Sequence, residues 1–431
     1  MIRISTAVTL LFFYPNFSQA ENQNYFQKAI ESAEKHLPEE RVKITSDKFQ
    51  YLNELSLDPS CPDTFHVVDL RVLIDRYQLW QQYLPNVTPY YAVKTNNDMV
   101  IAAVLSSLGT GFDCASENEI KQVLELDVDP SKIIFAHPRK PDRSILYAKK
   151  AGVHLVTFDS IEELDKMITL YPEANLLLRI KTDDSMSSSP LSEKFGVTVT
   201  EAYDILEEGF TKGANIKGIA FHVGSNCTHL ESYRKALVDA AELFRFSKNH
   251  LNQELSILDL GGGWPGTNDD SFIAIAEVVQ DLIKSHFNPE THFIAEPGRY
   301  FAAKTTTLAM KVIGKKRSKE EKKIAYYLSN GVFGFFISSL YYEYNLEKIL
   351  SEGWLIKPLA NNSSTTYPSL LWGPTCDSGD KILDEISLPE LATGEFLVVE
   401  NLGAYSKSLE TSFNGIPLSK AYYIWDLPPE N

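Results

Sequence analysis

Eight short apolar runs, each followed by an amphipathic stretch that suits a helix, limit the possible folds of this chain more than any other feature. The first five begin at positions 90, 111, 133, 155 and 176, and this spacing of about 22 residues holds one strand, one helix and two short turns. Eight such units predict a TIM barrel rather than a doubly wound sheet. No G-x-G-x-x-G motif follows an early strand, which argues against a dinucleotide-binding fold. The runs are 90–95, 111–116, 133–138, 155–160, 176–181, 218–223, 257–263 and 293–298.

The predicted strands end in polar residues. In a TIM barrel, the residues that carry the chemistry lie at the carboxyl ends of the strands. We therefore expect an active site on that face of the barrel. The polar strand ends are Lys94, Asp113, His137, Asp159, Arg179, His222, the glycine run 261–263 and Glu296.

The alternation of strand and helix stops after about residue 305. Apolar segments at 306–313, 324–329, 369–372 and 395–400 are separated by turns rich in Gly, Pro, Asn and Ser, which predicts a C-terminal β-sheet domain over 306–431. The charged stretch 315–323 is expected to be a hairpin or a loop. The barrel is assigned to residues 65–305. Residues 21–64, with a helix over 25–36, are expected to pack on the β-domain.

The first twenty residues have the pattern of a secretory signal peptide. Arg3 is their only charge, residues 7–14 are apolar, and the segment ends in Ser18-Gln19-Ala20. Cleavage is expected after Ala20, which predicts a secreted protein. The apolar run is too short to span a bilayer. The alternative is a buried N-terminal strand in a cytoplasmic protein.

Charge and cysteine content narrow the classes of partner. The formal net charge of -16 argues against nucleic acid and against an anionic membrane surface as partners. The four cysteines lie far apart without C-x-x-C spacing, so we expect free thiols rather than a disulfide framework or a metal site.

Three features of the predicted strand ends point to one cofactor. Lys94 follows apolar and aromatic neighbours, where burial is expected to lower its pKa and free the amine to attack a carbonyl. Glu296 suits a buried, protonated heterocyclic nitrogen. The glycine run 261–263 can present backbone N–H groups to a phosphate, and Arg299 supplies a guanidinium for the same group. An amine for an aldehyde, a carboxylate for a pyridinium and a phosphate cradle together describe pyridoxal 5′-phosphate.

Two further residues suit the same cofactor. His222 ends the sixth strand, where a flat imidazole could stack on the cofactor ring, and Ser225 could donate to its phosphate. Taken alone, His222 would be read as a core histidine.

At this point the motifs amount to a family resemblance. The chain resembles the eukaryotic ornithine decarboxylases, which are fold-type III pyridoxal phosphate enzymes with a TIM barrel and a β-domain. The resemblance runs from about residue 65 to about residue 415. It rests on motifs that occur in one order at 91–94, 111–116, 191–196, 221–225, 259–263, 295–299, 372–377 and 412–415.

The resemblance implies a role for each candidate residue. Lys94 would hold the cofactor covalently, Glu296 would pair with the pyridinium nitrogen and His222 would stack on the ring. Asp113 and Arg179 would line the site near the lysine. The phosphate would be held by Ser225, Gly261, Gly262, Gly263, Arg299 and Tyr405.

The resemblance also implies an obligate homodimer with shared active sites. In the family, the residues that correspond to Cys376 and Asp377 come from the partner subunit. Cys376 would return a proton to the substrate carbon, and Asp377 would hold the distal amine of the substrate. The implied reaction is the decarboxylation of L-ornithine to putrescine, a step of polyamine biosynthesis.

Two departures from the family pattern leave the substrate open. Tyr342 stands where the family has an aspartate that helps bind the substrate, with Glu343 next to it, and His137 stands where the family usually has asparagine. The chain could act on ornithine or another basic amino acid with Tyr342 or Glu343 substituting. It could take an apolar or aromatic amino acid. It could also be a non-catalytic regulator of the antizyme-inhibitor kind.

A cluster of basic residues is relevant to the alternative of a non-catalytic regulator. Arg139, Lys140, Arg143, Lys149 and Lys150 fall where the family binds antizyme, although a solvated helix face explains them equally well. A secreted protein would not meet antizyme.

Overall fold

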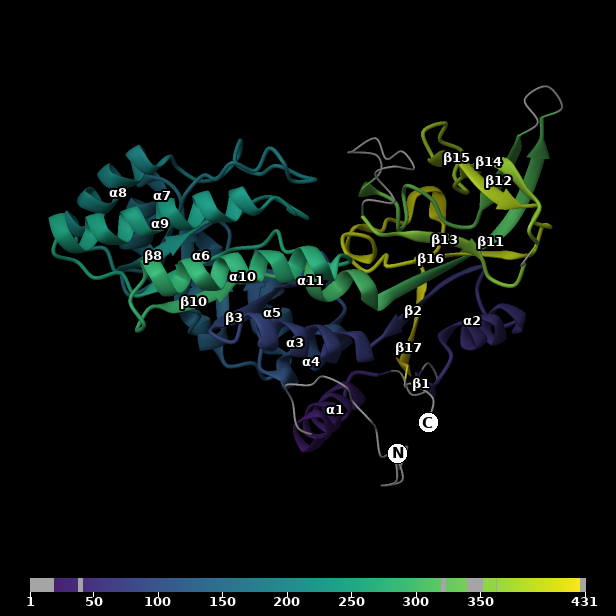
Figure 1. Ribbon diagram of the computed structural model, residues 1–431, viewed down its shortest axis with the longest axis horizontal. Coiled ribbons are helices and arrows are strands. Elements are labelled where there is room, and N and C mark those ends of the chain that lie inside the picture. Colours follow the sequence, from purple (N-terminus) through teal and green to yellow (C-terminus); the bar gives the residue numbers. More distant parts are fainter. Residues whose placement is uncertain (1–18, 38–41, 319–322, 339–351, 362, 427–431) are drawn as a thin grey trace.

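The computed structural model describes residues 19–37, 42–318, 323–338, 352–361 and 363–426. They form two parts, a barrel surrounded by helices and a β-sheet domain beside it (Figure 1). In the part of the chain that the structure describes, no helix is long and apolar enough to cross a membrane.

The barrel is closed and all its strands are parallel, as the sequence predicted. Its strands follow each other around the barrel in chain order, and the last pairs with the first. Each predicted run overlaps one of them, and four of the strands begin one to three residues before the run. The strands are β3 (Val87–Ala92), β4 (Gly111–Cys114), β5 (Ile133–Phe135), β6 (Leu155–Phe158), β7 (Asn175–Arg179), β8 (Ile216–Ala220), β9 (Ile257–Asp259) and β10 (His292–Ala295).

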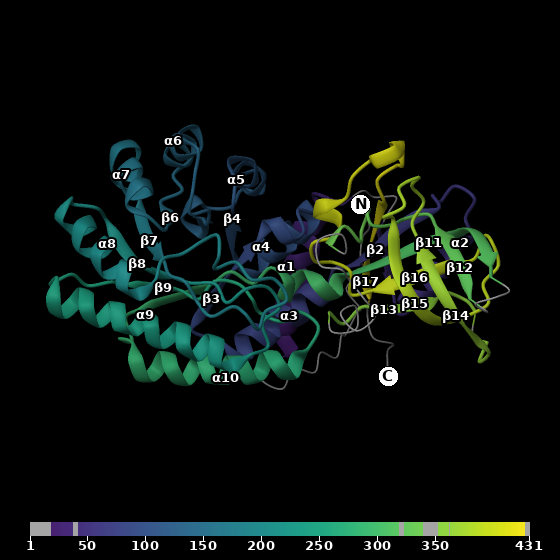
Figure 2. The ribbon, with the colours of Figure 1, turned by 90° about the horizontal axis from the view of Figure 1, so that it is seen from above.

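Helices cover the outside of the barrel, as Figure 2 shows from above. Several begin at a side chain that accepts hydrogen bonds from the first backbone N–H groups of the helix, such as Ser116, Ser160 and Thr198. These caps explain why the chain turns from strand to helix within a few residues. The helices are α3 (Arg71–Tyr83), α4 (Met99–Leu108), α5 (Glu117–Leu124), α6 (Asp142–Ala151), α7 (Ile161–Leu170), α8 (Val199–Thr211), α9 (Leu230–His250), α10 (Asp269–His286) and α11 (Arg299–Ala302).

The β-domain contains the four strands predicted after residue 305, here β11 (Thr306–Arg317), β12 (Ile324–Leu328), β14 (Thr366–Trp372) and β16 (Phe396–Glu400). The basic residues 315–317 extend β11, which pairs antiparallel with β12. The sheet also contains strands that were not predicted. These are β1 (Val42–Thr45), β2 (Thr64–Asp69), β13 (Leu355–Pro358), β15 (Lys381–Pro389) and β17 (Lys420–Asp426).

The division of the chain differs from the predicted one in two places. Strand β2 belongs to the β-domain, where it pairs with β11 and β17, so the barrel begins after it. Helix α1 (Gln19–Glu34) packs mainly on α4 of the barrel, where its face of Phe26, Ala29 and Ile30 joins the core. Phe26 also packs edge-on against Trp425 of β17, with ring centroids 5.3 Å apart, so α1 contacts the β-domain as well. Helix α2 (Lys48–Leu57) and β1 do pack on the sheet.

The expected signal peptide falls mostly on residues 1–18, which lie outside the described residues. The expected cleavage point after Ala20 falls at the start of α1.

Candidate active site

A cavity of about 350 Å³ lies at the carboxyl ends of the barrel strands, where the sequence placed the active site. Residues of the β-domain, including Ser338, Trp354 and Leu409, close part of its wall. Of the residues predicted to bind the cofactor, all except Gly261 line this cavity: Lys94, Asp113, Arg179, His222, Ser225, Gly262, Gly263, Glu296, Arg299 and Tyr405.

Lys94 lies in a 3₁₀ turn (Val93–Thr95) just after β3, and its ammonium donates a hydrogen bond to Asp113 at the end of the neighbouring strand. Burial acts to lower the pKa of Lys94, but the carboxylates of Asp113 and Glu296 outweigh it and raise the pKa above its ordinary value. The prediction that burial frees the amine is therefore wrong for the protein without cofactor. In that state Lys94 is an ammonium.

Glu296 follows β10, and its carboxyl group is buried. Burial, together with the nearby carboxylates of Asp259 and Asp113, raises its pKa well above the ordinary value. Its Oε1 atom is buried and has no hydrogen-bond partner among the described residues. Asp259 behaves similarly, because burial raises its pKa to about 7, and it accepts a hydrogen bond from the backbone of Gly261 at 2.8 Å. Glu296 thus offers a free carboxyl oxygen that can pair with a protonated ring nitrogen.

His222 is neutral and its orientation is fixed. Burial lowers its pKa well below the ordinary value, and the nearby cations Arg179 and Lys94 add to this effect. Nδ1 accepts a hydrogen bond from the backbone N–H of Gly224 at 3.1 Å. A Cβ at Gly262 would lie 2.6 Å from Nε2, so only glycine lets the ring lie this close to the loop. The imidazole presents an uncharged surface to the cavity.

The glycine loop and Arg299 form a site for an anion. Gly261 and Gly263 have positive φ angles of 59° and 107°, and a Cβ at Gly261 would lie 1.9 Å from the carbonyl oxygen of Phe221. Arg299 donates from Nη2 to Ser225 Oγ at 3.2 Å. Its Nε is buried and finds no acceptor among the described residues.

These groups fit pyridoxal 5′-phosphate. A primary amine, a carboxyl group with a free oxygen and a guanidinium with a free N–H all face one cavity. Each matches one group of that cofactor, namely its aldehyde, its ring nitrogen and its phosphate.

Comparison with known proteins agrees with this fit. A family model described as "pyridoxal-dependent decarboxylase, pyridoxal binding domain" matches residues 70–303. This chain belongs to the pyridoxal-dependent decarboxylases.

Similar proteins match most of the chain. A protein of Dictyostelium discoideum named "Probable ornithine decarboxylase" is 39% identical over 91% of this chain and 86% of its own length. "Antizyme inhibitor 2" of Xenopus laevis is 37% identical over 92% of this chain and 88% of its own length. Among solved structures, the arginine decarboxylase of Paramecium bursaria Chlorella virus bound to agmatine has a TM-score of 0.82. It is 33% identical, over 87% of this chain and all of that one.

Cys376 and Asp377 do not line the cavity of their own chain. They lie on the loop between β14 and β15, and both are exposed. The backbone N–H of Cys376 donates to the side chain of Asn414 at 3.0 Å, and that of Gly379 donates to Asp377 at 2.6 Å, so this loop of the decarboxylase is ordered by its own contacts. Tyr342 lies outside the described residues.

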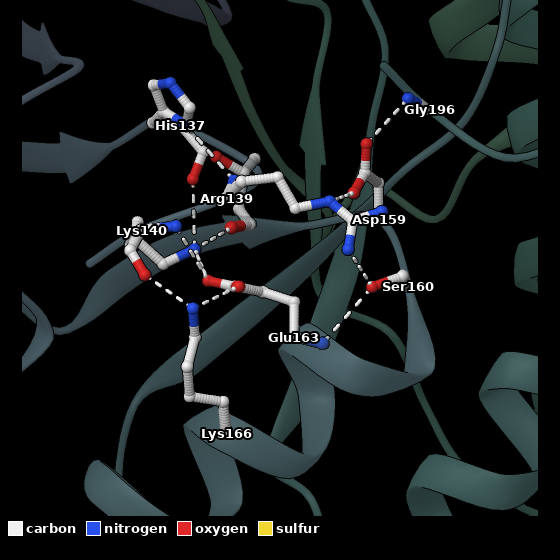
Figure 3. Close-up of polar contacts among 9 residues, drawn as sticks. His137, Arg139, Lys140, Asp159, Ser160, Glu163, Lys166 and Gly196 are labelled. Carbon is white, nitrogen blue, oxygen red and sulfur yellow. Dashed lines mark hydrogen bonds and ion pairs between the residues drawn. The ribbon is translucent and has the colours of Figure 1, made fainter. Parts of the chain in front are cut away.

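The predicted basic surface is only partly a surface. Lys140 is buried, and its ammonium donates to the carbonyl oxygens of His137 and Thr157 at 3.0 and 2.7 Å and pairs with Glu163 at 2.9 Å (Figure 3). Burial lowers the pKa of Lys140 to about 8 against the opposing effect of Glu163. The prediction is therefore wrong for Lys140, which holds the end of β5 in place. As a result His137 lines the cavity, with its ring at 5.6 Å from that of Phe195.

Two functional candidates were missed in the sequence. Asp259 stands two residues before the glycine run, and that position was a usable signal for a residue that orders the loop. Glu352 pairs with Arg299 at 2.7 Å although 53 positions separate them. No sequence motif around Glu352 indicates this role.

Proposed function

We propose that this decarboxylase acts on a basic L-amino acid, most favourably L-ornithine, and releases CO₂ and putrescine. One cavity brings together an amine, a carboxyl group with a free oxygen and a guanidinium with a free N–H, and this arrangement carries the proposal. Ornithine is favoured because relatives of that name match most of the chain and because Asp377 keeps a carboxylate for a distal ammonium.

Lys94, Glu296 and His222 each have a separate role in the proposed reaction. When bound, pyridoxal phosphate supplies an electron sink for the pair that stays on the substrate carbon after CO₂ departs. The amine of Lys94 would hold the cofactor covalently between turnovers. The free carboxyl oxygen of Glu296 would accept a hydrogen bond from the protonated ring nitrogen and so keep the proton on that nitrogen. The neutral ring of His222 covers the site without adding charge.

A second copy of the chain completes the site in this proposal. Cys376 and Asp377 are exposed and lie outside the cavity of their own chain, so they are available to the cavity of a partner. The thiol of the partner's Cys376 would give its proton to the substrate carbon. The carboxylate of the partner's Asp377 would bind the distal ammonium, and the homodimer would then be obligatory for activity.

The substrate is tested by CO₂ release from a panel of L-amino acids with the cofactor-loaded protein. We expect ornithine to be the best substrate, followed by lysine or arginine, and Lys94→Ala to be inactive. Asp377→Asn should raise KM for ornithine far more than for a neutral amino acid of equal length. Turnover restricted to leucine or phenylalanine would contradict the basic substrate and place the specificity change at Tyr342.

A non-catalytic role is the second candidate, because the relative from Xenopus is named an antizyme inhibitor. That role predicts no turnover of any amino acid in the same panel, even with cofactor bound. The intact set of cofactor-binding side chains favours the enzyme.

Export of the chain is also part of the proposal, on the pattern of residues 1–20. N-terminal sequencing of protein recovered from the medium of its own cells should begin at Glu21. Recovery only from inside the cells, with Met1 or Ile2 at the N-terminus, would contradict export.

A further inference from the structure

The guanidinium of Arg299 is held by a carboxylate from the β-domain. Oε2 of Glu352 lies 2.7 Å from Nη1 of Arg299, and only 1% and 13% of the two side chains are exposed. Glu352 lies just before β13, whereas Arg299 begins α11 of the barrel. The ion pair therefore joins the two parts of the molecule next to the cavity.

The turn that carries Glu352 is fixed by contacts with both parts. Thr267 of the barrel donates from Oγ1 to the carbonyl oxygen of Glu352 at 3.0 Å, and Asn401 of the β-domain donates to that of Gly353 at 2.8 Å. Gly353 has a φ of +78°, which favours glycine. The next residue, Trp354, is buried, packs edge-on against Phe336 and lines the cavity. The Glu352 carboxylate thus has a rigid support.

The remaining donors of Arg299 point to a ligand. Nη1 is used by Glu352 and Nη2 donates to Ser225, while Nε is buried without an acceptor among the described residues. Nε and Nη2 share one edge of the planar guanidinium, and this edge is the fork that binds two oxygens of a phosphate in parallel.

We propose that Glu352 is a positioning residue for the cofactor phosphate, because it binds Nη1 of Arg299 and leaves Nε and the second N–H of Nη2 for the phosphate. The inference depends on the cofactor and not on the identity of the amino acid substrate. It concerns a residue outside every motif on which the family resemblance rests.

The geometry has two opposing physical effects. An oriented fork loses little side-chain freedom when the anion arrives, which strengthens binding. A buried carboxylate close to a phosphate dianion repels it, which weakens binding. Our proposal is that orientation dominates, so removal of Glu352 must weaken the binding of the phosphate and nothing else.

The test compares pyridoxal 5′-phosphate with pyridoxal, which lacks the phosphate, by titrating each into the cofactor-free protein and measuring Kd from absorbance. For Glu352→Ala we expect the affinity for pyridoxal 5′-phosphate to fall by about tenfold or more, as for other residues that orient a ligand-binding group. The affinity for pyridoxal should stay within about twofold. Glu352→Gln keeps an oxygen acceptor for Nη1 and should recover most of the loss.

Two further variants make the test specific. Arg299→Ala should lose phosphate affinity, and adding Glu352→Ala to it should cost nothing more, because Glu352 acts through the arginine. Glu400 is also paired with lysines, at 3.1 Å from Lys48 and 2.9 Å from Lys357, but lies away from the cavity. Glu400→Ala should leave both affinities unchanged. Tighter binding of pyridoxal 5′-phosphate by Glu352→Ala, equal losses for both ligands, or additive losses with Arg299→Ala would each overturn the proposal.

Discussion

The ammonium of Lys94 donates a hydrogen bond to the carboxylate of Asp113, on the next strand of the barrel. This contact decides the charge of the lysine. Burial alone would lower its pKa, but Asp113 and Glu296 raise it, so the cofactor-free protein keeps Lys94 charged. The amine must lose a proton before it can attack the cofactor.

Replacing Asp113 should therefore speed the covalent attachment of pyridoxal 5′-phosphate at neutral pH. Asp113→Asn keeps the shape of the side chain and removes the charge, which lowers the pKa of Lys94, and each unit raises the amine fraction about tenfold. The measurement is the attachment rate against pH, followed by absorbance. Asp183→Asn, on an exposed loop, is the matched control. Superimposable profiles for Asp113→Asn and the unaltered protein would contradict the role of this contact.

Asp259 should make the stability of the cofactor-free protein depend on pH. Burial raises its pKa from the ordinary 3.8 to about 7, so the folded state binds the proton more tightly than the unfolded chain. Its contribution is fully present below about pH 4 and is lost as the pH rises through about 7. Asp259→Asn removes this dependence while keeping an acceptor for the backbone of Gly261. The difference in unfolding free energy between the two proteins, measured from pH 4 to 8, should change with pH, and a constant difference would refute the assignment.

The buried ion pair of Lys140 should matter more for stability than its exposed neighbours. Lys140→Met leaves Glu163 with Lys166 alone and removes the donor to two carbonyl groups, at a cost of about 3 kcal/mol. Lys149 forms an exposed pair with Glu173, and Lys149→Met should cost at most about 0.5 kcal/mol. Urea unfolding measures both. Similar small costs would mean that Lys140 is solvated after all.

The barrel was predictable because its units repeat. Eight apolar runs of similar spacing admit few other arrangements, and polar residues at their ends follow from the position of barrel active sites. Strand β2 was not predictable as part of the β-domain. All its residues are buried, so buried and exposed side chains do not alternate along it as they do in a strand at a sheet surface. Only its pairing with β11 and β17 assigns it to that sheet.

The site was predictable where chemistry is tied to a local motif. Lys94, Glu296 and the glycine run each occur in such a motif, and the cavity brings them together. Lys140 and Glu352 were not predictable, because their roles depend on partners distant in the sequence. A lysine next to arginine in a polar segment indicates a surface, and only the carbonyl groups of His137 and Thr157 explain why this one is buried.

We propose that a decarboxylase site forms from Lys94 of one chain and Cys376 of another. Mixing inactive Lys94→Ala with Cys376→Ala under conditions that let subunits exchange tests it most directly, with CO₂ release from ornithine as the readout. In a random mixture half the dimers are mixed and each has one intact site, so about a quarter of the activity should return. No recovered activity from a mixture shown to contain mixed dimers would contradict the account.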